Sequence, residues 1–374
     1  MKVGIDTFGC EHGRSGLGSY LTSLVHNLPS GGDMEFELFG PEMDRYIYTG
    51  DKDFRFEAVS VPDSLTAERW WHIFKANKFG KKQGYDAMLY AAGPRMIPKK
   101  FKVPGVAIVN DIVSNLFEKN DDWFFRQQMK RGLSKVDCII TPSQYVKKDL
   151  EKSGIKCRKI VVIHSGIDHS LFYPVQDFPV DAQTVDIKPF AIKRPYIVYA
   201  SRMENADKKH VELVRAFSLF KEKTGLPHRL VLAGSESRYG EQVHKAVFES
   251  SAASDIFITG YFPHESFPEL YRGAEACVFP SVTEGAGLSV LEAMATGVPV
   301  ACSDSGALKE VAGQNACFFN SNDIGDIESA IEKVLLDEGL RKKLIEGGIN
   351  WTKRFSWEKN AASTVDVFRQ LGME

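Results

Sequence analysis

The sequence predicts an α/β protein of two domains, each a doubly wound parallel sheet, with a ligand cleft between them. Short β-branched apolar segments alternate with longer amphipathic stretches along nearly the whole chain, which is the pattern of parallel strands covered by helices on both faces. The alternation stops once, between residues 174 and 195, in a proline-containing stretch without periodicity. At 374 residues the chain is long enough for two hydrophobic cores.

The first domain is expected over residues 1–175. Its helices are expected near residues 17–28, 66–82, 121–135 and 143–153, between apolar segments of strand length. The expected strands are Lys2–Asp6, Glu35–Phe39, Phe54–Val59, Ala87–Tyr90, Gly105–Val109, Asp137–Thr141 and Ile160–His164.

A linker is expected over residues 176–195, where several prolines interrupt the pattern. The second domain, residues 196–356, then repeats the alternation. Its strands are expected at Tyr196–Ala200, Arg229–Ala233, Ile256–Thr259, Ala276–Phe279, Val298–Cys302 and Ala316–Phe319. Helices are expected near 210–223, 240–250, 266–273, 288–296, 324–336 and 340–353, with a last one near 357–371.

Composition excludes several classes of protein. The net charge of −2, from 47 basic and 49 acidic residues, argues against a global nucleic-acid-binding surface. The six cysteines are scattered without a Cys-x-x-Cys pair, which favours buried thiols in a reducing compartment. The N-terminal sequence lacks the apolar region of a signal peptide, and no apolar run approaches the ~18–20 residues that span a bilayer. We therefore expect a cytoplasmic protein, at most attached to the inner face of a membrane.

The segment from Pro280 to Pro299 has the sequence PSVTEGAGLSVLEAMATGVP and carries the most chemical information. An expected helix starts near Leu288, and its first turn offers unpaired N–H groups and a positive dipole end to an anion such as a diphosphate. Glu284, just before this helix, is placed to accept hydrogen bonds from sugar hydroxyls. Glu292 lies about one turn further in, at a depth suited to ribose hydroxyls. The alternative is a glycine-rich turn before a buried helix, with two solvated glutamates.

The Glu-x(7)-Glu element, followed by GVPV, resembles that of the family 4 glycosyltransferases, which are retaining enzymes with two facing Rossmann-like domains, the GT-B fold. The resemblance covers nearly the whole chain. It includes GRSGLGSY near the N-terminus, HSGIDHSLFYP at residues 164–174, YASRMENADKKH with Ser201 in place of a glycine, and Phe-Ser-Trp-Glu at residues 355–358. In this family the last helix, here 357–374, usually crosses back to the first domain.

The resemblance implies roles for individual residues. Arg202 and Lys208 would bind the nucleotide diphosphate and balance its charge as it leaves. Glu284 would hold the transferred sugar and Glu292 the ribose. The residues with supporting roles are the backbone amides of Gly285, Ala286, Gly287 and Leu288 at the sugar, Gly234 where the backbone approaches the nucleotide sugar, Tyr261 and Phe262 beside the base, and Gly16 in the first domain facing the phosphates and the acceptor.

Several of these assignments have plain alternatives. Arg202 could be a surface ion-pair partner, and the lysine could be Lys209 instead of Lys208. Gly234 could serve only as a strand-end turn. Tyr261 and Phe262 fit a core or cleft wall better than a base-reading site.

One departure from the family pattern follows the strand GVAIV. Many members carry His-Asp there, with the histidine near the sugar, whereas this chain has Asn110-Asp111. Asparagine can hydrogen-bond a hydroxyl, but it cannot carry positive charge or shuttle a proton. Asp111 remains the candidate to orient or deprotonate the acceptor hydroxyl, and a role as a strand-end cap is the alternative.

Two further features of the sequence bear on metal binding. Asp51-Lys52-Asp53 matches an Asp-x-Asp metal motif but lies in a polar turn, which favours a solvated turn. The nine histidines show no metal-ligand spacing, so no metal site and no metal requirement are predicted.

Aromatic and basic residues interleave from Arg69 to Lys82. Spacings of three and four place Trp70, Trp71 and Phe74 on one helical face beside a basic rim. One hypothesis is an interfacial helix that docks on anionic lipid, where a lipid-linked acceptor would lie. The other is a core helix with a solvated lysine tail.

Together these features predict a retaining hexosyltransferase that moves a sugar from a nucleotide sugar to a hydroxyl of a growing glycan. The resemblance leans towards mannosyltransferases of bacterial surface polysaccharide biosynthesis, with GDP-mannose as the donor. Two alternatives remain: another GT-B enzyme, such as a nucleotide-sugar epimerase or a sugar phosphorylase, or a nucleotide-sugar-binding protein that has lost catalysis.

Overall fold

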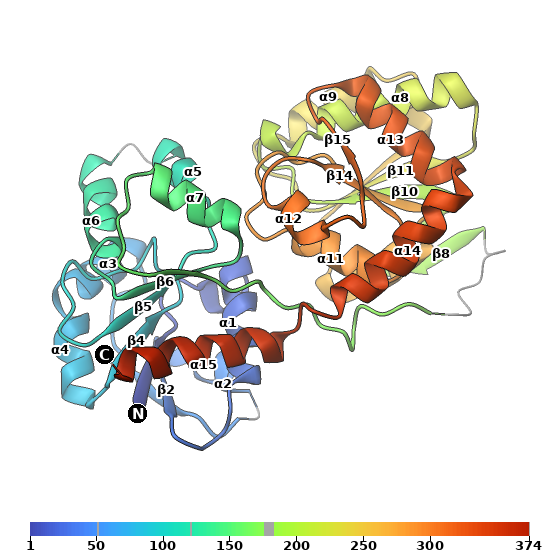
Figure 1. The fold of residues 1–374 in the computed structure, drawn as a ribbon. Coiled ribbons are helices and arrows are strands. Elements are labelled where there is room, and N and C mark those ends of the chain that lie inside the picture. Colours follow the sequence, from blue (N-terminus) through green and yellow to red (C-terminus); the bar gives the residue numbers. More distant parts are fainter. Residues whose placement is uncertain (51, 120–121, 176–182, 374) are drawn as a thin grey trace. The chain divides into compact units, whose positions relative to one another are not determined.

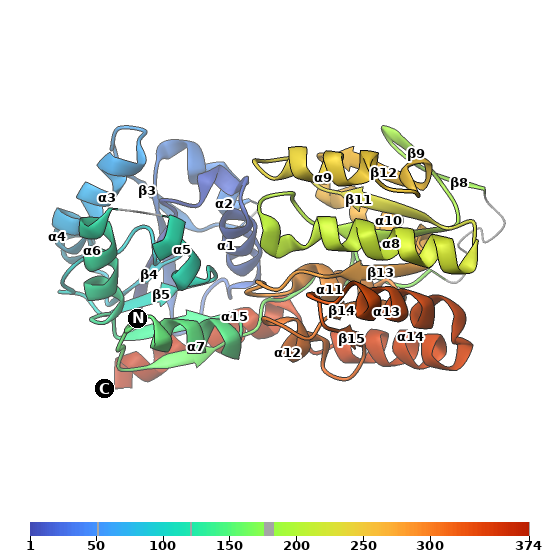
Figure 2. The same cartoon turned by 90° about the horizontal axis from the view of Figure 1, so that it is seen from above.

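The computed structural model describes residues 1–50, 52–119, 122–175 and 183–373. Asp51 of the Asp-x-Asp segment, residues 176–182 of the expected linker and Glu374 lie outside the described residues. The chain forms two compact units (Figures 1 and 2). Unit 1 comprises Met1–Gly166 and Phe355–Glu374, and unit 2 comprises Ile167–Arg354.

The described part of unit 1 contains a sheet of seven parallel strands in the order β3-β2-β1-β4-β5-β6-β7. The chain builds one half outward from β1 and then crosses to β4 on its other side, so the strand order reverses between β1 and β4. Ile5 of β1 pairs with Leu38 of β2 and with Leu89 of β4. The strands are β1 (Lys2–Asp6), β2 (Glu35–Gly40), β3 (Arg55–Ala58), β4 (Ala87–Tyr90), β5 (Gly105–Ile108), β6 (Cys138–Thr141) and β7 (Ile160–Val162).

Helices α1 and α7 of unit 1 begin at serine caps. Ser15 accepts a hydrogen bond from Gly18 N–H at the start of α1, and Ser143 does the same for Val146 at α7. The helices before the C-terminal segment are α1 (Gly16–Asn27), α2 (Arg45–Thr49), α3 (Leu65–Phe74), α4 (Ala76–Gln83), α5 (Val113–Lys119), α6 (Trp123–Leu133) and α7 (Gln144–Lys152).

The C-terminal helix α15 (Trp357–Met373) packs against α1 and belongs to the core of unit 1 (Figures 1 and 2). Its Val365 and Phe368 are buried together with strand residues of β1 and β2. Gly166 lies directly against the start of this helix, because a Cβ there would meet the backbone nitrogen of Trp357 at 2.3 Å. The glycine of the HSGIDH segment is therefore required by the contact of two chain segments.

Unit 2 has its own sheet of six parallel strands in the order β12-β11-β10-β13-β14-β15. Its order reverses between β10 and β13. The strands are β10 (Tyr196–Ala200), β11 (Arg229–Ala233), β12 (Ile256–Gly260), β13 (Ala276–Phe279), β14 (Val300–Ser303) and β15 (Cys317–Phe319). Both sheets confirm the predicted fold class of two α/β domains with parallel sheets.

Helices cover the sheet of unit 2 in two groups. One group joins α8 (His210–Thr224), α9 (Gly240–Phe248) and α13 (Ile324–Leu336), with α8 and α13 side by side (Figure 2). The other joins α10 (Phe267–Gly273), α11 (Leu288–Ala295), α12 (Leu308–Ala312) and α14 (Glu338–Thr352). Within the described residues no helix is long and apolar enough to pass through a bilayer.

The structure differs from the sequence prediction in the segment expected to be a linker. Residues Thr184–Ile187 (β8) and Phe190–Lys193 (β9) form an antiparallel hairpin that belongs to unit 2. Alternate side chains, Val185, Ile187 and Ile192, are buried, which is the period-two pattern of a half-buried strand. Two of the prolines that pointed to a linker, Pro189 and Pro195, stand in the turn and after the second strand, where no ladder hydrogen bond is needed.

Candidate active site

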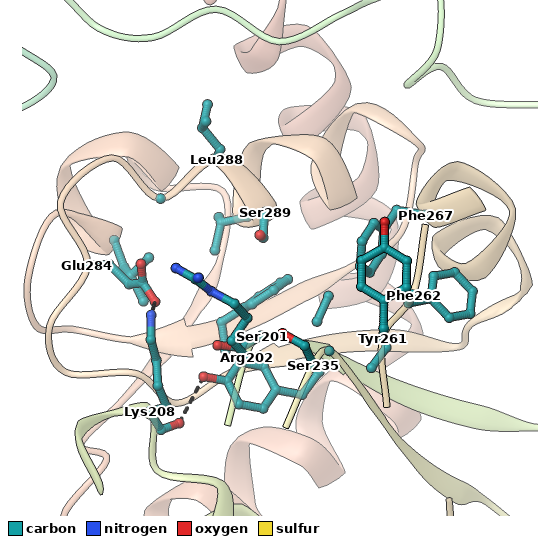
Figure 3. Close-up of a pocket in the computed structure, with 18 residues that line it drawn as sticks. Ser201, Arg202, Lys208, Ser235, Tyr261, Phe262, Phe267, Glu284, Leu288 and Ser289 are labelled. Atoms are coloured by element: carbon teal, nitrogen blue, oxygen red, sulfur yellow. Dashed lines mark hydrogen bonds and ion pairs between the residues drawn. The ribbon is translucent and has the colours of Figure 1, made fainter. Parts of the chain in front are cut away.

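A pocket of about 320 Å³ opens at the carboxyl edge of the unit 2 sheet, where β10 and β13 lie side by side and the strand order reverses. In open α/β sheets this crevice is where ligands bind. The ends of β10, β11 and β13 and the start of α11 contribute its walls (Figure 3). Eight of the predicted site residues line it: Arg202, Lys208, Gly234, Tyr261, Phe262, Glu284, Gly287 and Leu288.

The central contact of the pocket is an ion pair between Lys208 and Glu284. Lys208 Nζ donates to Glu284 Oε1 at 2.6 Å, and both side chains retain some exposure. The two residues come from different loops, one after β10 and one after β13 (Figure 3). Lys209, the alternative to Lys208, instead pairs its ammonium with Glu212 at 3.0 Å.

The two loops that carry this ion pair are bound to each other. Asp207 accepts a hydrogen bond from the Val282 N–H through its backbone carbonyl and one from the Thr283 hydroxyl through its carboxylate. Gly306 lies behind the Glu284 loop, and a Cβ there would meet Glu284 N at 3.0 Å. These contacts fix the separation of Lys208 and Glu284 before any ligand arrives.

Tyr199, the last residue but one of β10, lies under Lys208. Its hydroxyl donates to the Lys208 carbonyl at 2.8 Å. Burial, with the nearby negative charge of Glu284, raises the pKa of Tyr199 well above its ordinary range. Its ring packs on His210, whose pKa burial lowers to about 4. Both groups are therefore neutral at physiological pH and form an uncharged floor below the ion pair.

Helix α11 opens at the pocket without a side-chain cap. Its N-cap is Gly287, with φ +62°, and no side chain bonds the first N–H groups. A Cβ at Gly287 would meet Val311 Cγ2 at 2.6 Å, so glycine is required by both backbone and packing. Leu288 and Ser289 line the pocket from the first turn, whereas Gly285 and Ala286 are not among the lining residues.

Arg202 extends into the pocket between Glu284 and Ser289 (Figure 3). Its side chain is 73% exposed, and its contact with Glu204 is at 4.0 Å. An exposed pair at this distance contributes little. The guanidinium is thus available to an incoming anion.

Gly234 follows β11 at the back of the pocket. A Cβ at this position would meet the carbonyl oxygen of Ser201 at 2.2 Å. The absent side chain therefore makes room for the neighbouring β10 loop, in addition to lining the pocket.

Tyr261 and Phe262 differ in their environment although they are adjacent. Phe262 is buried and stacks on Phe190 of the hairpin, with ring centroids 5.4 Å apart. Tyr261 is 74% exposed and stands at the pocket edge opposite Glu284 (Figure 3). Of the two, Tyr261 has the ring surface free for a planar ligand.

Glu292 does not line the pocket. It is 8% exposed on the second turn of α11, and its Oε1 lies 3.1 Å from His264 Nε2. This hydrogen bond raises the pKa of His264. Sequence reasoning missed His264, because it stands in a 3-10 turn, His264–Ser266, that carries no motif. It also missed three serines of the lining, Ser201 as a ligand-facing group, Ser235 and Ser289.

The candidate acceptor residues belong to unit 1. Asn110 and Asp111 follow β5, at the carboxyl edge of that sheet. The Asp111 carboxylate lies 3.4 Å from Arg95, which also contacts Glu11 at 3.3 Å. The Asp111 carboxylate therefore has a cationic neighbour within unit 1.

Gly16 and Gly18, both in the first turn of α1, have different roles. A Cβ at Gly18 would meet Cys10 O at 2.5 Å, while one at Gly16 meets nothing within 4 Å. Packing therefore requires glycine at position 18, whereas there is open space beside Gly16. In the described part of the chain, no group of three or more His, Cys, Asp or Glu side chains is arranged to hold a metal ion.

Solved structures share this fold over the full chain. Sucrose-phosphate synthase from Thermosynechococcus elongatus aligns with a TM-score of 0.76 at 20% identity, covering 100% of this chain and 99% of that one. HepE of Anabaena, solved in complex with UDP-glucose, aligns with a TM-score of 0.72 at 15% identity, covering 99% and 100%. Together with the two parallel-sheet units, these likenesses show that the chain has the GT-B fold.

Sequence comparison gives the family. Residues 14–171 match Glycosyltransferase Family 4, and residues 183–351 match Glycosyl transferases group 1. The first match falls mainly in unit 1 and the second within unit 2. The chain belongs to the family 4, group 1 glycosyltransferases, as its motifs predicted.

Curated relatives include mannosyltransferases. O-antigen chain mannosyltransferase B of Escherichia coli is 33% identical over 177 residues, 47% of this chain and 46% of the relative. The serotype-specific mannosyltransferase WbdA of Escherichia coli is 27% identical over 242 residues, 63% of this chain and 29% of the relative. A D-inositol 3-phosphate glycosyltransferase of Streptomyces bingchenggensis is 25% identical over 219 residues, 56% and 48%. The matched part spans less than half the length of each of these relatives.

Proposed function

We propose that this glycosyltransferase moves a mannosyl group from GDP-mannose to a hydroxyl of a growing glycan, with retention of the anomeric configuration. The observation that carries the proposal is the Lys208–Glu284 ion pair in the pocket at the carboxyl edge of β10 and β13. It supplies a cation for a leaving phosphate and a carboxylate for sugar hydroxyls within one hydrogen bond of each other.

The proposed step is a front-face displacement. The bond from C1 of the hexose to the β-phosphate oxygen breaks, and its electron pair leaves with the nucleoside diphosphate. The acceptor oxygen forms its bond to C1 on the same face, and its proton passes to the departing phosphate oxygen. Atoms and charges balance without another reactant.

Negative charge develops on the leaving diphosphate in the transition state. Stabilising this charge is the main way in which the protein can lower the activation free energy. Arg202 is exposed and extends into the pocket, Lys208 stands beside it, and the uncapped N-terminus of α11 offers backbone N–H groups. We propose that these groups balance the charge, so that transfer requires no metal ion.

When the sugar nucleotide binds, the Glu284 carboxylate has lone pairs left after it accepts from Lys208. We propose that these accept from sugar hydroxyls, so the ion pair orients the carboxylate instead of blocking it. At the opposite wall, the exposed ring of Tyr261 would cover one face of the base.

On unit 1, we propose that Asp111 orients the acceptor hydroxyl through a hydrogen bond. Asp111 Oδ2 lies 3.4 Å from Arg95, and the carboxylate has further lone pairs that can accept this hydrogen bond. We assign proton acceptance to the leaving phosphate.

Mannose is proposed from the two mannosyltransferase relatives, and an O-antigen-like polysaccharide, presented on lipid, is the proposed acceptor. A thermal-shift panel of GDP-mannose, GDP-glucose, UDP-glucose and ADP-glucose tests the donor, because a ligand that binds the folded state raises the melting temperature. GDP-mannose should give the largest shift. A larger shift with a UDP-sugar would overturn the proposed donor. Release of GDP with transfer of an α-linked mannose, followed by NMR of the product, tests retention.

A further inference from the structure

Four large aromatic side chains of unit 1 are exposed together. Trp70 and Phe74 on α3 are 48% and 63% exposed, and Trp123 and Phe124 at the start of α6 are 70% and 46% exposed. The Trp70 ring stacks on Phe74 with centroids 5.1 Å apart and planes 9° apart, and lies 6.3 Å from the ring of Phe124. We call these four residues the aromatic patch. Trp70, Phe74 and Phe124 form a contiguous apolar surface, which Trp123 adjoins in the chain, and such a surface marks an interaction site.

The exposure does not come from loose packing of the helix. Trp71, the neighbour of Trp70, is buried against Phe8 and Phe39 in the core of unit 1. The spacing predicted Trp70, Trp71 and Phe74 on one helical face, and that prediction is wrong. Trp71 faces the core, while Trp70 and Phe74 face away from it. Helix α3 thus has apolar side chains on two faces, only one of which is covered within unit 1.

The surroundings of the aromatic patch are basic. Lys99 Nζ lies 4.8 Å from the centroid of Phe124 and 6.0 Å from that of Phe74. The segment that follows Lys99 is bound to α4, since the Lys102 N–H donates to Asn77 Oδ1 at 2.8 Å. Four more exposed lysines stand on these two segments: Lys75, Lys78, Lys100 and Lys102.

On the described residues of α3, α4 and the start of α6, acidic groups do not offset this charge. Within the fully described segment 65–83 the one acidic residue, Glu68, is buried. Asp122 is exposed beside Trp123, but its carboxylate accepts from the N–H groups of Phe124 and Phe125 and caps α6. The patch is therefore an apolar surface with a cationic rim.

We propose that the aromatic patch docks on the surface of an anionic lipid bilayer. Aromatic rings partition into the boundary between headgroups and acyl chains, while lysines at the rim contact anionic headgroups. The rim consists of lysines, whose mobile point charges suit a fluid array of headgroups better than a fixed set of carboxylates. A lipid-linked acceptor would lie at the same membrane surface. This point alone rests on the proposed function.

Vesicle flotation tests the proposal with neither sugar nucleotide nor acceptor present, so its outcome is independent of the proposed function. The wild-type protein should float with equimolar phosphatidylcholine and phosphatidylglycerol, and stay behind with phosphatidylcholine alone. High salt should weaken the binding, because the attraction is screened. Equal binding to both kinds of vesicle, or no binding to either, overturns the proposal.

Two sets of variants locate the contact. Trp70→Ser/Phe74→Ser/Phe124→Ser should lose vesicle binding, whereas Phe248→Ser, which removes an isolated ring that is 88% exposed in unit 2, should retain it. Lys75→Gln/Lys78→Gln/Lys100→Gln should weaken binding by at least about tenfold, and Lys245→Gln, a lysine 73% exposed elsewhere, should not. Retained binding by the aromatic triple variant overturns the assignment of the patch.

A measurement on the wild-type protein covers the case in which the triple variant fails to fold. When the protein is bound to anionic vesicles, lipids brominated near the headgroup should quench its tryptophan fluorescence. The reason is that Trp70 and Trp123 of the aromatic patch are exposed. The quenched fraction should fall in Trp70→Phe/Trp123→Phe, which keeps aromatic volume. Undiminished quenching in that variant, or binding of a soluble acidic polypeptide such as polyglutamate in place of vesicles, overturns the proposal.

Discussion

His264 and Glu292 are joined by a hydrogen bond of 3.1 Å between the imidazole Nε2 and the carboxylate Oε1. The contact ties the loop after β12 to helix α11, whose N-terminus opens on the pocket. Glu292 is the second glutamate of the family motif, and its partner is a titratable group whose charge changes near neutral pH.

This contact predicts a pH-dependent contribution to stability. The hydrogen bond to Glu292 raises the pKa of His264 above its ordinary value of 6.5. Because His264 binds its proton more tightly in the folded state, protonation stabilises the fold at pH values below the unfolded-state pKa. This contribution is lost as the pH rises through the folded-state pKa. We expect His264→Gln to lower the melting temperature more at pH 5.5 than at pH 8.5, by thermal denaturation at both. His244→Gln, a half-exposed histidine of unit 2, is the control. An equal effect of His264→Gln at both pH values would contradict the prediction.

A second prediction concerns the ion pair at the centre of the pocket. Glu284→Ala should reduce transfer by about 10²–10³-fold with the fold retained, since it removes a group positioned for the transition state. Lys208→Ala should lose a similar factor, and the double variant should lose less than the product of the two, because each single change leaves its partner unmatched. Steady-state kinetics of the three variants measures the coupling. Fully multiplicative losses would show that the two residues act separately.

Arg202 is expected to recognise phosphate. Arg202→Ala should weaken GDP binding by about 1.5–3 kcal/mol, and guanosine binding should change little. Arg215→Ala, an exposed arginine on α8 outside the pocket lining, serves as the matched control. Isothermal titration of both ligands separates the cases, and an equal loss for guanosine and GDP would mean that Arg202 does not contact the phosphates.

The two glycines at the start of α1 should respond differently to the same substitution. Gly18→Ala places a methyl group 2.5 Å from Cys10 O and should destabilise the protein by about 1–3 kcal/mol. Gly16→Ala meets no atom within 4 Å and should leave stability nearly unchanged. Urea unfolding of both variants measures the difference. Comparable destabilisation by the two substitutions would show that the close approach to Cys10 O is not what requires glycine at position 18.

The strands could be predicted because local pattern and burial agree. The run Tyr196–Ala200 is apolar at every position and is a fully buried strand, and β4, β6 and β13 are likewise buried at every position. The hairpin of β8 and β9 was missed because it is half-buried and its alternation is short and next to prolines. Helices α2, α5 and α12 were missed for a related reason: five to seven residues give little periodicity.

Within the site, the motif predicted which residues line the pocket better than it predicted their partners. Lys208 and Glu284 are 76 positions apart and meet only because β10 and β13 are neighbours in the sheet. Gly234 was expected to face a ligand, yet its missing side chain also accommodates the backbone of Ser201. Such contacts depend on strand order, which no single segment of the sequence specifies.

The packing of α15 into unit 1 has a consequence for how the protein is made. The core of unit 1 needs Val365 and Phe368, but the whole of unit 2 is encoded before them. During synthesis the second unit can leave the ribosome and fold while the first still lacks its last helix. The part of α1 that α15 contacts therefore stays uncovered until α15 has been synthesised, and this interval adds to the exposure of the nascent chain to aggregation.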